Sequence, residues 1–192
     1  MRMTSGGIHL KLGIEPDICV LAKAIGNGYP MAAIIGKKDI MNAAQKTFIS
    51  STYWTDRIGP AAAIATIKKH IKCDASSHLV KIGELVQKGW RSLAEKYRLN
   101  IEVTGIPPLS HWKIKTDESE LAHTFIVKKM LEKGFLTSRA FYATCAHTEK
   151  DVDHYLKSLE DVLKVSADHI REGKIKKLYK GPPAHTGFKR LA

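Results

Sequence analysis

Residues 16–36 read PDICVLAKAIGNGYPMAAIIG, and this stretch decides the fold class. Two apolar runs, Ile18 to Ala22 and Met31 to Ile35, flank a short segment rich in glycine, asparagine and proline. Apolar runs separated by residues of this kind are typical of β-strands joined by a turn. The pattern therefore predicts a strand, a turn and a second strand.

Lys23 lies where the first apolar run ends. A lysine at the mouth of a buried strand is partly desolvated, and desolvation favours its neutral amine. The neutral amine is the form that makes a Schiff base with an aldehyde. The same position also suits an ordinary solvated ammonium group at a strand end, so the residues alone leave both interpretations open.

The whole stretch resembles the lysine segment of the class III aminotransferases, which are pyridoxal 5'-phosphate enzymes of fold type I. Within that family, the stretch resembles the glutamate-1-semialdehyde 2,1-aminomutase branch. The resemblance implies that Lys23 forms a Schiff base with the cofactor and later moves a proton on the substrate. Lys23 is accordingly the predicted catalytic residue and a predicted cofactor-binding residue.

A second segment, from Ser50 to Thr52, carries three neighbouring hydroxyl groups. Such groups can donate hydrogen bonds to phosphate oxygens, although serine and threonine are also ordinary turn formers. Ser51 and Thr52, followed by Gly59–Pro60 and an alanine-rich stretch, resemble a family segment whose threonine holds the cofactor phosphate of the neighbouring subunit. The resemblance implies that Thr52, together with Ser51, binds phosphate and that the intact protein is a homodimer.

The resemblance extends toward the C-terminus. Gly134–Leu136 and Ala146–Thr148 resemble the closing strand of the family and the start of its last helix, and GFKRL at 187–191 resembles the tail of some members. The family's cofactor-pairing aspartate, its glycine-rich phosphate loop and its ring-stacking aromatic residue have no counterpart in this sequence. We therefore expect the C-terminal portion of a longer enzyme, inactive by itself as a truncated fragment.

The composition suits a globular protein but also suggests a rival function. The 192 residues are 44% hydrophobic, and their net charge is +12. A basic module that binds acidic partners is therefore the alternative to an enzyme. The basic residues are spread along the chain, and their densest cluster, Lys174 to Lys180, is typical of a solvated tail. Zinc-finger spacing and RNA-recognition motifs are absent, so we expect no nucleic-acid partner.

The cysteine and histidine residues do not predict a metal site. Cys19, Cys73 and Cys145 are far apart in sequence, which indicates neither a disulfide framework nor a zinc site. His147 lies just before Thr148 and Asp151, a pair spaced like a capping box. His147 is therefore expected outside a helix rather than in a metal centre.

Strands that alternate with helices predict an α/β architecture. It would comprise the end of a large cofactor-binding domain at 1–76 and a small C-terminal α/β domain at 77–192. With no apolar run of membrane-spanning length, we expect a soluble, cytoplasmic protein. The family resemblance implies an enzyme that acts on small amino and keto substrates. The residues do not distinguish a transaminase from an aminomutase. Helices are also predicted at Asp39–Ala44, at the apolar stripe from Leu79 to Tyr97 and at Glu118–Lys133, and Asp39 is the expected cap of the first of them. Later strands are predicted at Ile101–Val103, at Trp112–Ile114 and in the region from Phe135 to Cys145.

Overall fold

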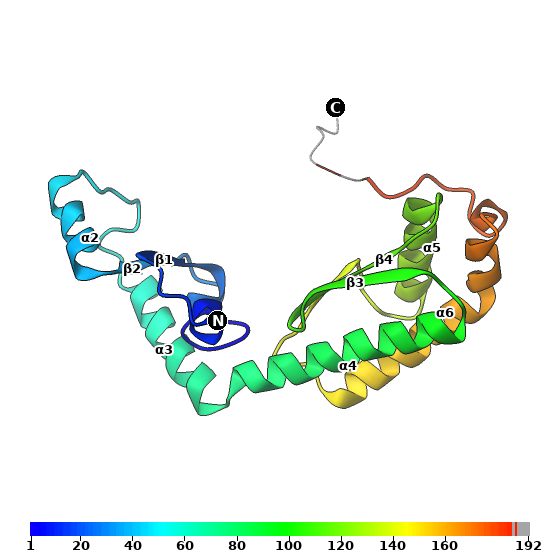
Figure 1. The fold of residues 1–192 in the computed structure, drawn as a ribbon, viewed down its shortest axis with the longest axis horizontal. Coiled ribbons are helices and arrows are strands. Elements are labelled where there is room, and N and C mark those ends of the chain that lie inside the picture. The colour runs from blue at the N-terminus through cyan, green and yellow to red at the C-terminus, as the bar shows by residue number, and fades with distance from the viewer. Residues whose placement is uncertain (186, 188–192) are drawn as a thin grey trace. The chain divides into compact units, whose positions relative to one another are not determined.

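The computed structural model describes residues 1–185 and 187, so residues 188–191 of the predicted tail motif lie outside the described residues. The chain divides into two compact units, an N-terminal unit of Met1–Leu79 and a C-terminal unit that begins at Val80. Their assignment to a large and a small domain stays a prediction. The elements, coloured in chain order in Figure 1, are α1 (Ile8–Leu12), β1 (Ile18–Leu21), η1 (Lys23–Ile25), β2 (Ala33–Gly36), α2 (Lys38–Asn42), η2 (Ala43–Lys46), α3 (Ile58–Lys72), α4 (Ala75–Lys96), β3 (Ile101–Ile106), β4 (Leu109–Ile114), α5 (Ser119–Glu132), β5 (Ala140–Tyr142), α6 (Glu149–Arg171) and η3 (Ile175–Lys177).

The strand, turn and strand predicted for residues 16–36 are confirmed. Strands β1 and β2 pair antiparallel, with Val20 opposite Ile34 and Cys19 opposite Ile35. The two strands form a sheet by themselves in the described residues. The turn between them contains the short 3₁₀ helix η1, which begins at Lys23.

Helix α3 packs against this turn. Gly59, in its first turn, is buried, and a Cβ atom there would lie 2.8 Å from the carbonyl oxygen of Pro30. A larger residue would therefore push the helix away from the turn. At its other end, α3 is linked to the N-terminal loop, because the hydroxyl of Ser5 and Nδ1 of His70 lie 2.9 Å apart.

The helix predicted at Asp39–Ala44 exists, but its expected cap is wrong. Helix α2 begins one residue earlier, at Lys38, and its N-cap is Lys37 without a side-chain hydrogen bond. Asp39 lies inside the first turn, where a negative charge interacts favourably with the helix dipole. Lys37 is held in place by Asp17, whose carboxylate lies 2.7 Å from its amine.

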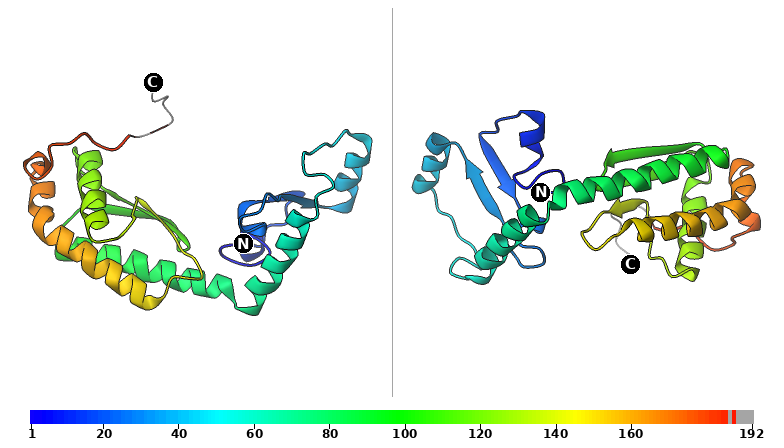
Figure 2. Two further views of the ribbon diagram at one scale, coloured as in Figure 1. Left: turned by 180° about the vertical axis from the view of Figure 1, so that it is seen from behind. Right: turned by 90° about the horizontal axis from the view of Figure 1, so that it is seen from below.

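The C-terminal unit is built on an antiparallel sheet of order β3-β4-β5. The hairpin of β3 and β4 is longer than predicted and closes through the two residues between Ile106 and Leu109. The strand predicted between Phe135 and Cys145 is reduced to β5. Helices α4 and α6 run alongside each other (Figure 2), joined by ion pairs such as that between Lys81 and Glu149.

The core of this unit contains a row of aromatic rings from four elements. Trp90 of α4 stacks on Trp112 of β4 with 5.6 Å between ring centroids, and His123 of α5 lies edge-on to Trp112 at 5.1 Å. The indole N–H of Trp90 donates to the hydroxyl of Tyr155 on α6 over 2.9 Å. The row therefore packs three helices against the sheet. This packing agrees with the apolar stripe predicted for α4.

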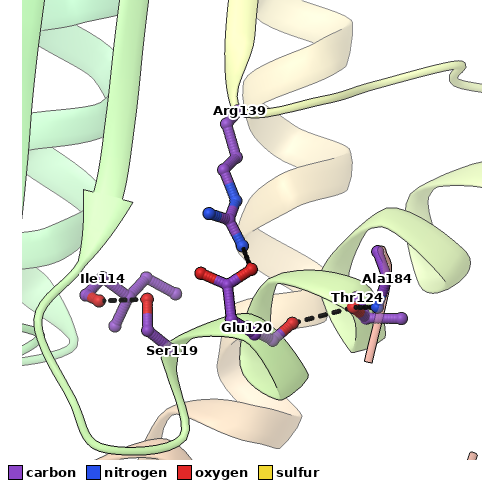
Figure 3. A network of polar contacts seen from close by, with 6 residues as sticks. All are labelled: Ile114, Ser119, Glu120, Thr124, Arg139 and Ala184. Carbon is purple, nitrogen blue, oxygen red and sulfur yellow. Dashed lines mark hydrogen bonds and ion pairs between the residues drawn. The ribbon is translucent and has the colours of Figure 1, made fainter. Parts of the chain in front are cut away.

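Polar contacts fix the N-terminal ends of α5 and α6. Helix α6 begins with the predicted capping box, in which the Thr148 hydroxyl accepts from the Asp151 N–H and Asp151 accepts from the Thr148 N–H. Figure 3 shows the network around α5, where the Ser119 hydroxyl donates to the Ile114 carbonyl over 2.7 Å. In the same network, Arg139 pairs with Glu120 and lowers the pKa of that carboxyl group.

His123 predicts a pH-dependent stability of the C-terminal unit. It is 3% exposed, and neither ring nitrogen has a hydrogen-bond partner among the described residues. Burial, with help from the nearby charge of Arg139, lowers its pKa from 6.5 to about 4. The unfolded chain therefore binds more protons below pH 6.5, and the free energy of unfolding should fall by about 3 kcal/mol as the pH drops from 7 to 4.

Urea unfolding followed by tryptophan fluorescence at several pH values checks this expectation. His123→Leu should remove most of the loss, whereas His111→Gln, on the exposed side of β4, should leave it unchanged. An unfolding free energy of His123→Leu with the same pH slope as the original protein would show that another group is responsible.

Candidate functional site

Lys23 opens η1, two residues after the end of β1. Its backbone φ is 55°, in the left-handed region that residues other than glycine rarely adopt. This conformation costs free energy, on the order of 1–2 kcal/mol. Strain of this kind is retained where the surrounding structure imposes it, and such positions cluster at functional sites.

The turn after Lys23 imposes that conformation. The backbone carbonyl oxygen of Lys23 accepts hydrogen bonds from the N–H groups of Gly26 and Asn27, with N···O distances of 3.2 Å and 3.3 Å. Gly26 is buried, and a Cβ atom there would overlap the carbonyl oxygen of Tyr29. Gly28 has a φ of 110°, which strains any other residue. The glycines of the quoted stretch therefore hold the lysine in its turn.

The expected desolvation of Lys23 is wrong for the described residues. Its side chain is exposed, and so are Val20 and Ile34 on the neighbouring strands. An interior strand would desolvate the amine at its end, but a sheet of two strands offers no covering layer. The amine of Lys23 is thus accessible to a ligand.

Ser51 and Thr52 lie in an exposed turn before α3. The Ser51 hydroxyl accepts from the N–H of Tyr53 over 3.3 Å, which is the turn-forming role that the sequence also allowed. No hydrogen bond joins either hydroxyl to Lys23 in the part of the chain that the structure describes. The two predicted cofactor-binding segments are therefore not brought together by these contacts within one chain.

Ser51 does lie at a hollow of about 530 Å³ in the N-terminal unit. The hollow is also lined by Pro30 and Met31, from the loop that follows the Lys23 turn, and by Asp56. Asp56 was not singled out in the sequence, although it accepts from the Ile58 N–H over 2.8 Å at the start of α3. Its position two residues before that helix was the signal, because aspartate is a common cap.

The donor set of this unit fits pyridoxal 5'-phosphate. An exposed primary amine at Lys23 can hold an aldehyde carbon, and the exposed hydroxyl groups of Ser51 and Thr52 can donate to phosphate oxygens.

A second hollow, of about 510 Å³, lies in the C-terminal unit. Aromatic side chains from three separate stretches line it, including Trp90, Phe141 and Tyr155. Burial raises the pKa of Tyr155 to about 12, so its hydroxyl stays protonated. The oxygen of this hydroxyl accepts the hydrogen bond from the indole N–H of Trp90. No local sequence pattern indicates this hollow, because its walls are adjacent only after folding.

A metal site needs several ligating side chains close together in the described residues. Histidine, cysteine and carboxylate side chains do not gather there in groups of three that could hold a metal ion. Cys19, Cys73 and Cys145 form no disulfide bond with one another in the described residues. Within the same residues, no helix combines the length and apolar character needed to cross a membrane.

Sequence comparison identifies relatives of this chain. The family model for class III aminotransferases matches residues 7–163. The acetylornithine aminotransferase of Methanocaldococcus jannaschii is 29% identical over 162 residues, which are 78% of this chain and 38% of the relative. The glutamate-1-semialdehyde 2,1-aminomutase of Methylacidiphilum infernorum is 28% identical over 181 residues, 85% of this chain and 42% of the relative. The chain thus spans about two fifths of the length of these relatives.

Solved structures show the same fold. The Sphingopyxis sp. MTA144 FumI protein, which holds pyridoxal phosphate, has a TM-score of 0.76 at 22% identity, covering 85% of this chain and 40% of that one. A β-phenylalanine aminotransferase from Variovorax paradoxus also has a TM-score of 0.76 at 22% identity, covering 87% and 43%.

The predicted fold class, α/β and part of a fold type I transferase, is confirmed by these neighbours. Pyridoxal 5'-phosphate is the cofactor that they and the family match support. The match with the family model covers most of the sequence. This chain therefore belongs to the class III aminotransferase family.

Proposed function

We propose that this chain carries the cofactor lysine of a pyridoxal phosphate-dependent enzyme that moves an amino group, and that this lysine is Lys23. The observation that carries the proposal is the left-handed backbone of Lys23, φ 55°, in a glycine-held turn inside the region matched by the family model. A left-handed backbone also occurs at Asn27, Asp74 and Arg98, so the proposal rests on this geometry together with the family match.

Lys23 would perform two tasks. Its Nζ would hold the cofactor covalently through the aldehyde carbon, which requires the neutral amine. Once the lysine amine is free, the same Nζ would take a proton from the substrate carbon that bears the amino group. It would return that proton at the C4′ atom of the cofactor. The bound cofactor supplies an electron sink for that proton transfer. The exposed position of Lys23 leaves room for these movements.

Ser51 and Thr52 would hold the phosphate group. Both residues are exposed, and no hydrogen bond joins their hydroxyls to Lys23 within the described residues, which agrees with a role toward the cofactor of a second subunit. The proposed active assembly is accordingly a homodimer in which each chain contributes a lysine to one site and hydroxyl groups to the other. The substrates would be small amines and carbonyl compounds.

The finer proposal is chemistry like that of glutamate-1-semialdehyde 2,1-aminomutase, an enzyme found among the relatives at 28% identity. Because the chain covers 42% of that relative, we propose that it is active only when the rest of the fold is present. The chain alone would then be an inactive portion of the enzyme.

Selective labelling of Lys23 tests the proposal. The chain is fused to the segment of the M. infernorum aminomutase that it does not cover, mixed with pyridoxal 5'-phosphate, and reduced with borohydride. Peptide mass spectrometry should find the pyridoxyl group on Lys23. Lys23→Ala should abolish the near-visible absorbance of the complex, whereas Lys38→Ala, an exposed lysine of the same unit, should keep it.

Labelling spread over surface lysines, with no preference for Lys23, would contradict the proposal. Binding of polyanions that weakens steeply with salt and is unaffected by Lys23→Ala would instead support the basic-module alternative.

The glycine turn gives a second prediction. Gly26→Ala should lower the yield of pyridoxyl-Lys23 in the fusion by about tenfold or more, because the added Cβ overlaps the Tyr29 carbonyl and displaces the turn. Gly13→Ala is the control, since Gly13 has open space around it; its φ of 65°, unlike the −90° of Gly26, adds backbone strain without a steric clash. Equal yields from the two variants would show that the turn does not position the lysine.

A further inference from the structure

The hollow lined by Trp90, Phe141 and Tyr155, here called the aromatic hollow, has the size and the walls of a ligand site. Its volume is about 510 Å³, and side chains of α4, β5, α6 and the loop before β5 line it. Sites for small molecules typically measure about 300–1,000 Å³ and combine apolar and aromatic walls with a few polar groups. All the residues that line the aromatic hollow belong to the C-terminal unit, whereas Lys23 belongs to the other unit.

Part of the wall of the aromatic hollow belongs to the core. Val86 is fully buried and Trp90 is 2% exposed, although both line the hollow. Trp90 is held by its hydrogen bond to Tyr155, and Tyr155 lies edge-on to Phe135 with 5.9 Å between the ring centroids. Rings that are already held by packing lose little freedom when a ligand binds. The hollow is therefore preformed.

The hydroxyl group of Tyr155 can make one more hydrogen bond. Its oxygen accepts from the indole N–H of Trp90, and no residue in the described part of the chain accepts the hydroxyl proton. The raised pKa of Tyr155, about 12, keeps that proton on the oxygen at neutral pH. A donor without a partner in a mostly apolar hollow favours a ligand that brings an acceptor oxygen.

Leu136 indicates that the occupant is apolar and uncharged. This side chain lies in the loop between α5 and β5 and lines the hollow, yet it is 93% exposed. An exposed leucine gains free energy when an apolar group covers it, and a ligand in the hollow would provide that group. A charged ligand would instead lose its hydration against the apolar walls.

We infer that the aromatic hollow binds a neutral aromatic small molecule that carries a carbonyl group. The rings of the ligand lie against Trp90 and Phe141, and its carbonyl oxygen accepts from the hydroxyl of Tyr155. Leu136 covers the ligand at the edge of the hollow. The inference rests on residues of the C-terminal unit alone and does not depend on the chemistry proposed for Lys23.

Equilibrium dialysis of the full chain with two neutral probes tests this site. Methyl 2-naphthoate has two fused rings and an ester carbonyl, and 2-isopropylnaphthalene has the same rings and nearly the same size without an acceptor. An ester also cannot exchange its oxygen for an amino group as the proposed substrates do. The ester should bind at one site per chain, about five times more tightly than the hydrocarbon, because it alone accepts from Tyr155.

Two pairs of variants assign the binding to the hollow. Tyr155→Phe should remove the preference for the ester and keep the binding of the hydrocarbon, whereas Tyr97→Phe should retain the preference, since Tyr97 does not line the hollow. Leu136→Asp should weaken both probes by about tenfold or more. Leu131→Asp is its matched control, because Leu131 is 58% exposed on α5 and lies outside the lining.

Three outcomes would overturn the inference. Equal affinity for the two probes would show that no hydroxyl of the chain selects the carbonyl. A preference that survives Tyr155→Phe would assign it to another donor, and binding that is unaffected by Leu136→Asp would place the probes elsewhere on the chain. Lys23→Ala should leave all these affinities unchanged, so that failure of the proposed chemistry and failure of this site give different results.

Discussion

The contact between helix α3 and the turn after β1 is the constraint on which the proposed site depends. Gly59 lets the first turn of α3 approach the carbonyl of Pro30, and Gly26 lets the turn fold back on Tyr29. These two close approaches leave Lys23 in a left-handed conformation at the start of η1. The position of the amine is thus set by backbone packing, while its side chain remains free to bind a ligand.

The two units rely on different physical sources of order. The C-terminal unit has a row of stacked rings, paired helices and a capped α6, all within its own residues. The N-terminal unit has few buried apolar side chains and a hairpin with two open edges. Ordering a chain costs conformational entropy that buried apolar area must offset. The unit with the lysine is therefore the one with less buried apolar area to offset that cost.

Much of this fold could be predicted because local patterns determine it. The two apolar runs around residues 26–30 indicated both strands, and Thr148 with Asp151 indicated the start of α6. Exposure could not be predicted in the same way, since the apolar run of β1 indicates an interior strand but does not say which residues cover it. The cap of α2 was misassigned because an aspartate suits either the cap or the first turn. The aromatic hollow depends on residues far apart in sequence, so no local pattern reveals it.

The assignment of Lys23 is the central claim, and one structure tests it most directly. The chain, joined to the segment that its relatives have in addition, should be crystallised with pyridoxal 5'-phosphate. The account predicts continuous electron density from Nζ of Lys23 to the cofactor, a positive φ at Lys23, and the hydroxyl of Thr52 at a phosphate group of the other subunit. Density that joins the cofactor to a different lysine, with Lys23 pointing into solvent, would contradict it.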